Sequence, residues 1–419
     1  MGYINGIIKS FIGLSYSLLP DVIDAFYSKR DSLQSYDAMI DTCLNILESL
    51  LVEKEINIKL ARSIFRLLSD IEITGEAEIM RTLRVIDPWL DISVGCEDAF
   101  SGENHLLDNL INYGDFNKYS VLINCYVSLK KNIGHEVSVE EVSKLVNLLK
   151  KDGPKKIYRH TLGYNYQNLK YIAQGKASAF SEALLGEGAF DMTTLMLCIL
   201  NSNYVFDELV NAIRKYYLSG CCSIPKECEG RILKDRLFEF IIASCYYKKL
   251  TMKEFEKACD DTEFVNHFLH SISIWSKKEE FVLEEWLIPC WEKVKNKHRD
   301  KKQQYAETLL HSIENALVPN EKLLDLYLDA VSCCERHAVM HVEMDSVLEF
   351  CSIDADKALK LAQALIEIND FVGNDEITLY TQKCVEVNRR DNARMLLNWL
   401  SDEGRISLSK KEEIAKILK

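Results

Sequence analysis

The sequence predicts an all-α protein, and three observations support this fold class. Apolar residues recur at steps of three and four over most of the chain, as the buried face of a helix requires. Glycine and proline are scarce, with 17 and 6 copies among 419 residues, whereas β-proteins need turn residues far more often. Helix-start signals also recur along the chain. We therefore expect degenerate helical-hairpin repeats that form an α-solenoid of the TPR/HEAT-like kind, with a less regular centre.

The clearest hairpin is expected over residues 305–330. Pro319 cannot lie inside a helix without losing a backbone hydrogen bond, and Asn320 is a favoured N-cap for the helix that follows. The apolar stripes on the two sides of this break are Tyr305, Leu309, Leu310, Ile313, Ala316 and Leu317, then Leu323, Leu324, Tyr327, Leu328 and Val331.

The elements before this hairpin divide the chain into three regions. Residues 1–92 are predicted to be helical, and Pro88 is expected to end a helix that includes Met80 and Ile86. A loop-like stretch over 93–104 separates this region from a central region, 105–230, whose glycine-rich and tyrosine-rich middle is irregular. Residues 231–419 are expected to be the C-terminal repeat region. Capping boxes are predicted at Ser138 with Glu141, Thr251 with Glu254, Ser276 with Glu279, and Ser409 with Glu412.

Composition limits the classes of function and the cell compartment. The formal charge of −13 argues against a general nucleic-acid or anionic-membrane binder. No segment reaches about 18 uninterrupted apolar residues, so we expect no membrane span. The start of the chain has no secretory leader, and the cysteines lie mostly in apolar helical patterns, which favours a reduced, cytoplasmic protein. The cysteines expected to be buried are Cys43, Cys125, Cys198, Cys245, Cys351 and Cys384.

One cluster has metal-ligand spacing. His337 and His341 are one helical turn apart, and Cys334 precedes His337 by three residues. The sequence ERHAVMH lacks the glutamate of the HExxH zinc-protease motif. A metal-dependent hydrolase built on these three residues is therefore an alternative function, while our expectation is that the chain binds no metal or cofactor. Cys221, Cys222 and Cys228 form at most half of a zinc knuckle.

Phosphate-binding loops are not expected. Lys176 follows Gly175, but no glycine stands five residues before this pair and alanine follows it, so a P-loop cannot be built. Gly186 and Gly188 lack the third glycine of a dinucleotide-binding fingerprint.

Residues 150–176 form a basic and aromatic island in an acidic chain. Tyrosine among cations suits a protein interface, and it also suits single-stranded nucleic acid, so a nucleic-acid-binding adaptor is a second alternative. A solvated face or an intramolecular acidic partner would explain the same pattern. The predicted partner-binding residues are Tyr158, Arg159, Tyr164, Tyr166, Lys170 and Tyr171.

A second basic island covers residues 293–302, at a helix end where cations offset the helix dipole. The nearby tryptophans Trp275, Trp286 and Trp291 are predicted to belong to the core.

Residues 286–419 resemble the helical tails of bacterial antiphage defence proteins, notably STAND-type NTPases and related effector fusions. The segments that carry the resemblance are EEWLIPCWEKV, LLHSIENALVPNEKLLDLYLDAV and ARMLLNWLSDEGRISLSKKEEIAKIL. In that family the tail is a sensor for a viral protein, but the ATPase motifs and an effector are not visible here. The resemblance implies a sensor module or a stand-alone scaffold subunit whose partner is a phage protein or another defence-system subunit.

These observations predict a non-enzymatic helical repeat protein that recognises a partner macromolecule, most simply a protein. The reason is that helical arrays offer continuous surface, whereas catalysis usually needs a preorganised pocket that excludes water.

Overall fold

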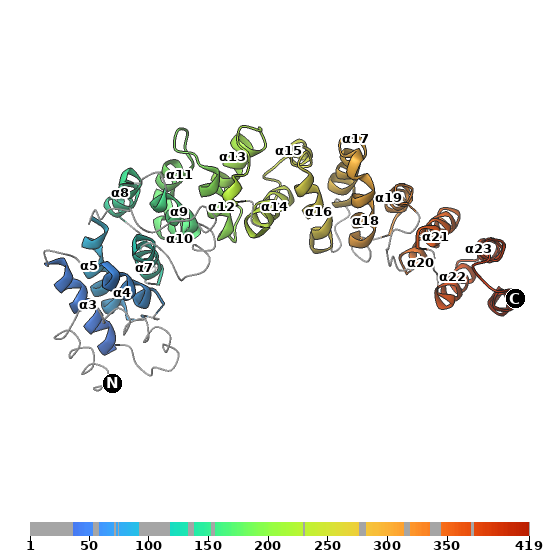
Figure 1. The fold of residues 1–419 in the computed structure, drawn as a ribbon, viewed down its shortest axis with the longest axis horizontal. Helices are drawn as coiled ribbons and strands as arrows, with labels where there is room; N and C mark the ends of the chain where they lie inside the picture. Colours follow the sequence, from blue (N-terminus) through green and yellow to red (C-terminus); the bar gives the residue numbers. More distant parts are fainter. Residues whose placement is uncertain are drawn as a thin grey trace. The chain divides into compact units, whose positions relative to one another are not determined.

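The structure is a computed structural model, and every regular element that it describes is a helix (Figure 1). The residues described are 37–52, 58–70, 73, 75–91, 118–132, 138–151, 156–228, 231–275, 282–313, 319–335, 345–369 and 373–418. These residues contain no β-strand, so the all-α prediction is confirmed. The chain divides into two compact units, Met1–Phe240 and Ile241–Lys419, and the division falls within one helix, α14. The predicted loop at 93–104 lies outside the described residues.

The first unit contains short helices, and many of them pack on helices two or three places away along the chain. Helix α4 packs against α7, α5 packs against α3 and α7, and α9 packs against α12. The helices are α3 (Asp37–Leu51), α4 (Ile58–Asp70), α5 (Glu76–Asp91), α7 (Lys118–Asn132), α8 (Val139–Leu148), α9 (Ile157–Tyr164), α10 (Tyr166–Ala173), α11 (Ala177–Leu185), α12 (Met192–Leu200), α13 (Asp207–Ala212) and α14 (Arg231–Tyr246). Shorter elements are the 3₁₀-helices η2 (Leu149–Lys151), η3 (Gln174–Lys176) and η5 (Lys226–Cys228), and the π-helix η4 (Ile213–Tyr217), which continues α13.

The prediction that Pro88 ends a helix is wrong, because α5 continues to Asp91. Trp89 and Leu90 are only 4% and 3% exposed. The ring of Trp89 also meets Phe65 of α4 edge-on, with centroids 5.5 Å apart. Burial of this last turn offsets the backbone hydrogen bond that proline removes.

The second unit is also built from helices that pack on one another. Helix α16 packs against α18, α18 against α19, α19 against α21, and α21 against α23. The helices are α15 (Met252–Ala258), α16 (Thr262–Trp275), α17 (Ile288–Lys297), α18 (Lys302–Ile313), α19 (Glu321–Val331), α20 (Asp345–Phe350), α21 (Ala355–Asn369), α22 (Asn374–Glu386), α23 (Arg390–Asp402) and α24 (Leu408–Ala415). The shorter elements are the π-helix η6 (Val282–Leu287) and the 3₁₀-helices η7 (Arg299–Lys301) and η8 (Lys416–Leu418).

The hairpin predicted over 305–330 is present as α18 and α19. Asn320 caps α19, because its Oδ1 accepts a hydrogen bond from the Leu323 amide at 2.9 Å. Tyr305 and Tyr327 are 1% exposed and lie in the core on the two sides of the break. The predicted apolar positions Ala316 and Leu317 lie outside the described residues.

The other predicted helix starts have mixed outcomes. The capping boxes at Ser138 and Thr251 are confirmed by reciprocal hydrogen bonds with Glu141 and Glu254. The box at Ser409 is wrong, because the cap of α24 is Ser407, whose hydroxyl accepts from the Lys410 amide. A serine two residues earlier therefore takes the capping position. Ser276 lies outside the described residues.

Burial agrees with the predicted core. Trp286 and Trp291 are 1% exposed, which confirms two of the three tryptophans, while the side chain of Trp275 lies outside the described residues. All six cysteines that were expected to be buried are buried. Within the described part of the chain, no helix combines the length and the apolar character that crossing a membrane requires.

Candidate functional site: a groove between α11 and α13

The six residues predicted to contact a partner lie on α9 and α10, and burial corrects this set. Tyr158 is 2% exposed and Tyr166 is fully buried, with its hydroxyl 2.8 Å from Ser181 Oγ. Both rings belong to the helical core and offer no surface to a partner. Tyr164 is half-buried, and Tyr171 is 60% exposed. Tyr171 is therefore the member of the set whose ring is mostly open to solvent.

The two predicted cations hold neighbouring helices together. Arg159 Nη1 donates to the carbonyl oxygens of Ala183 and Leu184 at 3.1 Å and of Ala189 at 2.7 Å. These carbonyls lie at and just beyond the C-terminal end of α11, where helix carbonyls lack partners within the helix. Lys170 donates to Glu208 Oε1 at 2.5 Å and lies 5.6 Å from the centre of the Phe206 ring.

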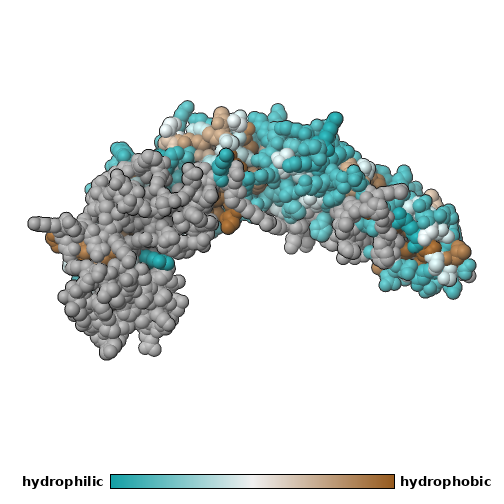
Figure 2. Space-filling view, viewed as in Figure 1, coloured by the Kyte–Doolittle hydropathy of each residue, from teal (hydrophilic) through white to brown (hydrophobic). Residues whose placement is uncertain are grey.

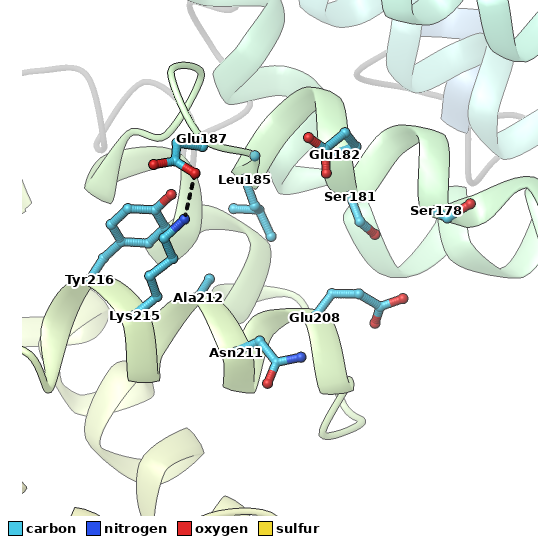
Figure 3. Close-up of a pocket in the computed structure, with 11 residues that line it drawn as sticks. Ser178, Ser181, Glu182, Leu185, Glu187, Glu208, Asn211, Ala212, Lys215 and Tyr216 are labelled. Atoms are coloured by element: carbon cyan, nitrogen blue, oxygen red, sulfur yellow. Dashed lines mark hydrogen bonds and ion pairs between the residues drawn. The ribbon is translucent and has the colours of Figure 1, made fainter.

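Beside this pair, the structure forms a surface groove of about 420 Å³ (Figure 3). One wall is α11, the other is α13 with η4, and the turn after α11 closes one end. The residues that line it are Ser178, Ser181, Glu182, Leu185, Gly186, Glu187, Glu208, Asn211, Ala212, Lys215 and Tyr216. Leu185 and Ala212 are buried and form an apolar floor. Figure 2 shows apolar side chains gathered over the part of the first unit that holds α11 and α13.

Local backbone geometry shapes both walls of the groove. Gly186 lets the chain turn tightly off α11, because a Cβ there would lie 2.4 Å from the Glu182 carbonyl oxygen. On the opposite wall, Ile213–Tyr217 is a π-helix, a widened turn that is frequent at functional sites. The Tyr216 ring stacks on Phe190 with ring centroids 3.6 Å apart. The stack fixes the turn against the π-helix.

The groove has an uneven distribution of charge. At one end, Lys215 Nζ lies 3.2 Å from Glu187 Oε2, and this hydrogen bond raises the pKa of Lys215. Glu208, near the start of α13, has part of its charge neutralised by Lys170. Glu182 has no ion-pair partner among the residues that the structure describes. The groove therefore keeps net negative charge above an apolar floor (Figure 3).

Asp191 anchors the turn that closes the groove. Its carboxylate accepts hydrogen bonds from the Thr194 amide and hydroxyl, at 3.0 and 2.8 Å, and from Lys156 at 2.8 Å. His160 Nε2 lies 3.2 Å from the same carboxylate. Burial alone would raise the pKa of Asp191, but the hydrogen bonds from His160, Lys156 and Thr194 outweigh it and hold this pKa well below its usual range.

The second basic island is paired within its own unit. Lys293 and Lys297 both contact Asp260, at 2.8 and 2.9 Å, and Lys295 contacts Asp329 at 2.7 Å. Burial opposes ionisation of Asp260, but the two lysines outweigh it and lower its pKa. These cations therefore tie α17 to the turn after α15 and to α19.

The metal candidates are only partly described. His337 and His341 lie outside the described residues. Cys334 is half-buried, and burial raises the pKa of its thiol to about 12. Cys228 is buried with its sulfur 3.4 Å from Thr193 Oγ1, whereas Cys221 is exposed. Across the described part of the chain, no three His, Cys, Asp or Glu side chains are placed to hold a metal ion.

Comparisons with protein-family models, with curated proteins and with solved structures found no match for this chain.

Sequence reasoning missed the groove but found the helices beside it. The basic island at 150–176 pointed to α9 and α10, and Lys170 reaches from there to Glu208 on the groove wall. Glu182, Asn211 and Tyr216 gave no signal, because each is an ordinary residue at an exposed or half-buried helical position. The Gly186-Glu187-Gly188 turn, which lacks the third glycine of a dinucleotide-binding fingerprint, is the nearest signal that the sequence offers.

Proposed function

We propose that this chain is a non-enzymatic α-helical repeat protein that binds a partner protein through the groove between α11 and α13. The observation that carries the proposal is the groove itself, an open depression of about 420 Å³ with a buried apolar floor and charged walls. Binding sites of this kind combine apolar surface with a few polar groups that fix orientation. The proposal keeps the predicted contact residue Tyr171, which is exposed on the adjoining helix.

The helical packing supports a binding role. In the second unit, helices contact the next helix or the next but one along the chain. Stacked hairpins in an α-solenoid would produce this order, and such arrays expose long surfaces suited to macromolecules. The solenoid arrangement of the whole chain is part of the proposal.

The groove chemistry favours binding over catalysis. The described residues that line it include no histidine or cysteine. Of its two serines, Ser181 shares a hydrogen bond with Tyr166, and Ser178 is exposed. A serine nucleophile needs a base within hydrogen-bonding reach, and neither serine is hydrogen-bonded to a carboxylate or an imidazole among the described residues.

The resemblance of residues 286–419 to defence sensor tails adds a biological setting to the proposal. In that setting the chain is a sensor or scaffold subunit, and its partner is a phage protein or another subunit of the defence system. The alternative of a metal-dependent hydrolase at Cys334, His337 and His341 has a direct test: stoichiometric zinc in the purified chain, measured by elemental analysis, would support it.

Affinity capture with a matched pair of variants tests the binding role. Ser178 on α11 lines the groove, whereas Ser49 on α3 is an exposed serine of the same unit outside it. Tagged wild-type chain, Ser178→Trp and Ser49→Trp are used to capture proteins from an extract, and mass spectrometry identifies what is retained. We expect one protein to be retained by wild type and by Ser49→Trp and lost from Ser178→Trp. Equal retention by all three chains would remove the groove from the proposal.

A further inference from the structure

The inference below rests on the proposed function and specifies what the groove recognises. Of the charged side chains that line the groove between α11 and α13, the exposed carboxylate of Glu182 is the one left without a partner among the described residues. Glu182 points along the wall of the groove without an ion pair in the described chain, while Lys170 and Lys215 are already paired with Glu208 and Glu187 (Figure 3).

We infer that the groove binds an arginine side chain of the partner protein, with the aliphatic stem over Leu185 and Ala212 and the guanidinium beside Glu182 and Glu208. Arginine joins a long apolar stem to a planar cation, and this matches an apolar floor flanked by carboxylates. Guanidinium can donate to two carboxylates at once, because its five N–H groups fan out in one plane.

The charge balance of the groove argues for a cation as the occupant. Its lining contains Glu182, Glu187 and Glu208 against the single cation Lys215. Lys170, just outside the lining, offsets part of the charge of Glu208. An acidic ligand would meet uncompensated carboxylates, whereas a cation would complete the pairing of Glu182.

The aromatic end of the groove is taken by the chain's own side chains, because Tyr216 stacks on Phe190 and Lys215 Nζ lies 5.2 Å from the centre of the Tyr216 ring. Tyr216 is half-buried and held by its stack on Phe190, so its position is fixed before a ligand arrives. The guanidinium is therefore assigned to the other end of the groove, beside Glu182 and Glu208 (Figure 3). Asn211, on the same wall, holds its side-chain oxygen toward Arg214 at 2.7 Å, which leaves its amide hydrogens for a backbone carbonyl of the ligand.

Peptide selection on the full chain provides the probe. A displayed library of random linear peptides is selected on immobilised wild-type chain and counter-selected on Ser178→Trp, which fills the groove. A selected peptide is then synthesised in two forms, one with arginine and one with citrulline, which has the same shape without the charge. Fluorescence anisotropy measures the affinity of both peptides for wild type, Glu182→Gln and the matched control Glu48→Gln, an exposed glutamate on α3.

We expect selected peptides to contain arginine and to bind Ser178→Trp at least about tenfold more weakly than wild type. Citrulline should weaken binding to wild type by about tenfold, and Glu182→Gln should weaken the arginine peptide but not the citrulline peptide. Glu48→Gln should leave both affinities unchanged.

Two results would overturn the inference, and they separate it from the proposed function. Peptides that need the groove but bind equally with citrulline, or that carry acidic residues, would refute arginine recognition and leave protein binding in the groove intact. Peptides that bind Ser178→Trp as tightly as wild type would refute both. Circular dichroism of each variant shows that a lost affinity does not reflect a lost fold.

Discussion

Lys170 of α10 and Glu208 of α13 form an ion pair, with Nζ 2.5 Å from Oε1. The pair connects the helix that the sequence singled out as basic to the wall of the groove that the structure reveals. Lys170 also lies over the Phe206 ring, so one side chain fixes both the start of α13 and the charge of Glu208. The side chain of Lys170 is 16% exposed, which shields the pair from solvent more than an ordinary surface ion pair.

Lys170→Glu should lower the free energy of unfolding by about 1–2 kcal/mol, because it places two carboxylates side by side. The charge-swapped double variant Lys170→Glu with Glu208→Lys should recover about half of this loss or more. Urea unfolding of the wild type, both single variants and the double variant forms the required cycle. A double variant whose loss equals the sum of the single losses would show that the two side chains do not interact in solution.

Arg159→Ala should destabilise the first unit by about 1–3 kcal/mol, since three carbonyl oxygens at the end of α11 lose their donor. Arg394→Ala is the matched control, because Arg394 is exposed and its one ion-pair partner among the described residues is Asp391 on its own helix. We expect the control to change stability by less than about 0.5 kcal/mol. Thermal unfolding followed by circular dichroism measures both, and equal effects of the two variants would contradict the structural role of Arg159.

Asp191 should make stability depend on acidity. Its pKa in the folded chain lies below its unfolded value, so its contribution is complete above the unfolded pKa of about 3.9 and is lost as the pH falls toward the folded pKa. Asp191→Asn keeps the cap of α12 but removes the charge, whereas Asp191→Ala removes both. At pH 7 we expect Asp191→Ala to cost about 1–3 kcal/mol and Asp191→Asn to cost less.

Unfolding titrations at several pH values between about 7 and 3 test this account of Asp191. The difference in free energy of unfolding between wild type and Asp191→Asn should shrink below about pH 4. A difference that stays constant over this range would show that the pKa of Asp191 is not lowered by folding. The difference between Asp191→Asn and Asp191→Ala should be independent of pH, because it reports the cap alone.

Close packing between α9 and α12 depends on a glycine. A Cβ on Gly163 would lie 3.2 Å from both Thr194 Cγ2 and the Thr194 carbonyl oxygen, and both belong to a buried helix. Gly163→Ala should therefore cost about 1–3 kcal/mol, although alanine favours the helix itself. Gly175→Ala is the control, because nothing lies within 4 Å of the added Cβ. A Gly163→Ala chain as stable as the Gly175→Ala chain would contradict this helix crossing.

The sequence predicted the helices well because their information is local. The cap at Asn320 and the stripe around Tyr305 depend on spacing along the chain, and both are present. The predictions at Pro88 and Ser409 are wrong for other reasons. Tertiary burial continues the helix past Pro88, and Ser407 takes the capping position that Ser409 was expected to fill. The groove could not be predicted, because Glu182 and Asn211 come together only through the packing of α11 against α13. Tyr158 and Tyr166 show the same limit of sequence-based prediction. A helical tyrosine has the same local sequence pattern whether it packs in a core or contacts a partner, and these two are buried.

Whether the basic island binds nucleic acid is decided by how many of its cations are free. Lys156 is paired with Asp191, Lys170 with Glu208, and Arg159 with the carbonyls after α11. A phosphate would have to displace these contacts. Each of the three cations would therefore gain less binding free energy from a phosphate than a solvated cation would. We expect single-stranded oligothymidylate to bind the full chain only weakly at low salt.

Electrophoretic mobility shift at several salt concentrations measures this binding. If nucleic acid were the true ligand, affinity would be submicromolar and would fall steeply with salt, with a log–log slope of about −0.7 for each phosphate neutralised on a single strand. Lys156→Ala would then reduce the slope by roughly the same amount. A flat, weak response in wild type and in Lys156→Ala is the expected result, because Lys156, Arg159 and Lys170 are held in contacts within the first unit.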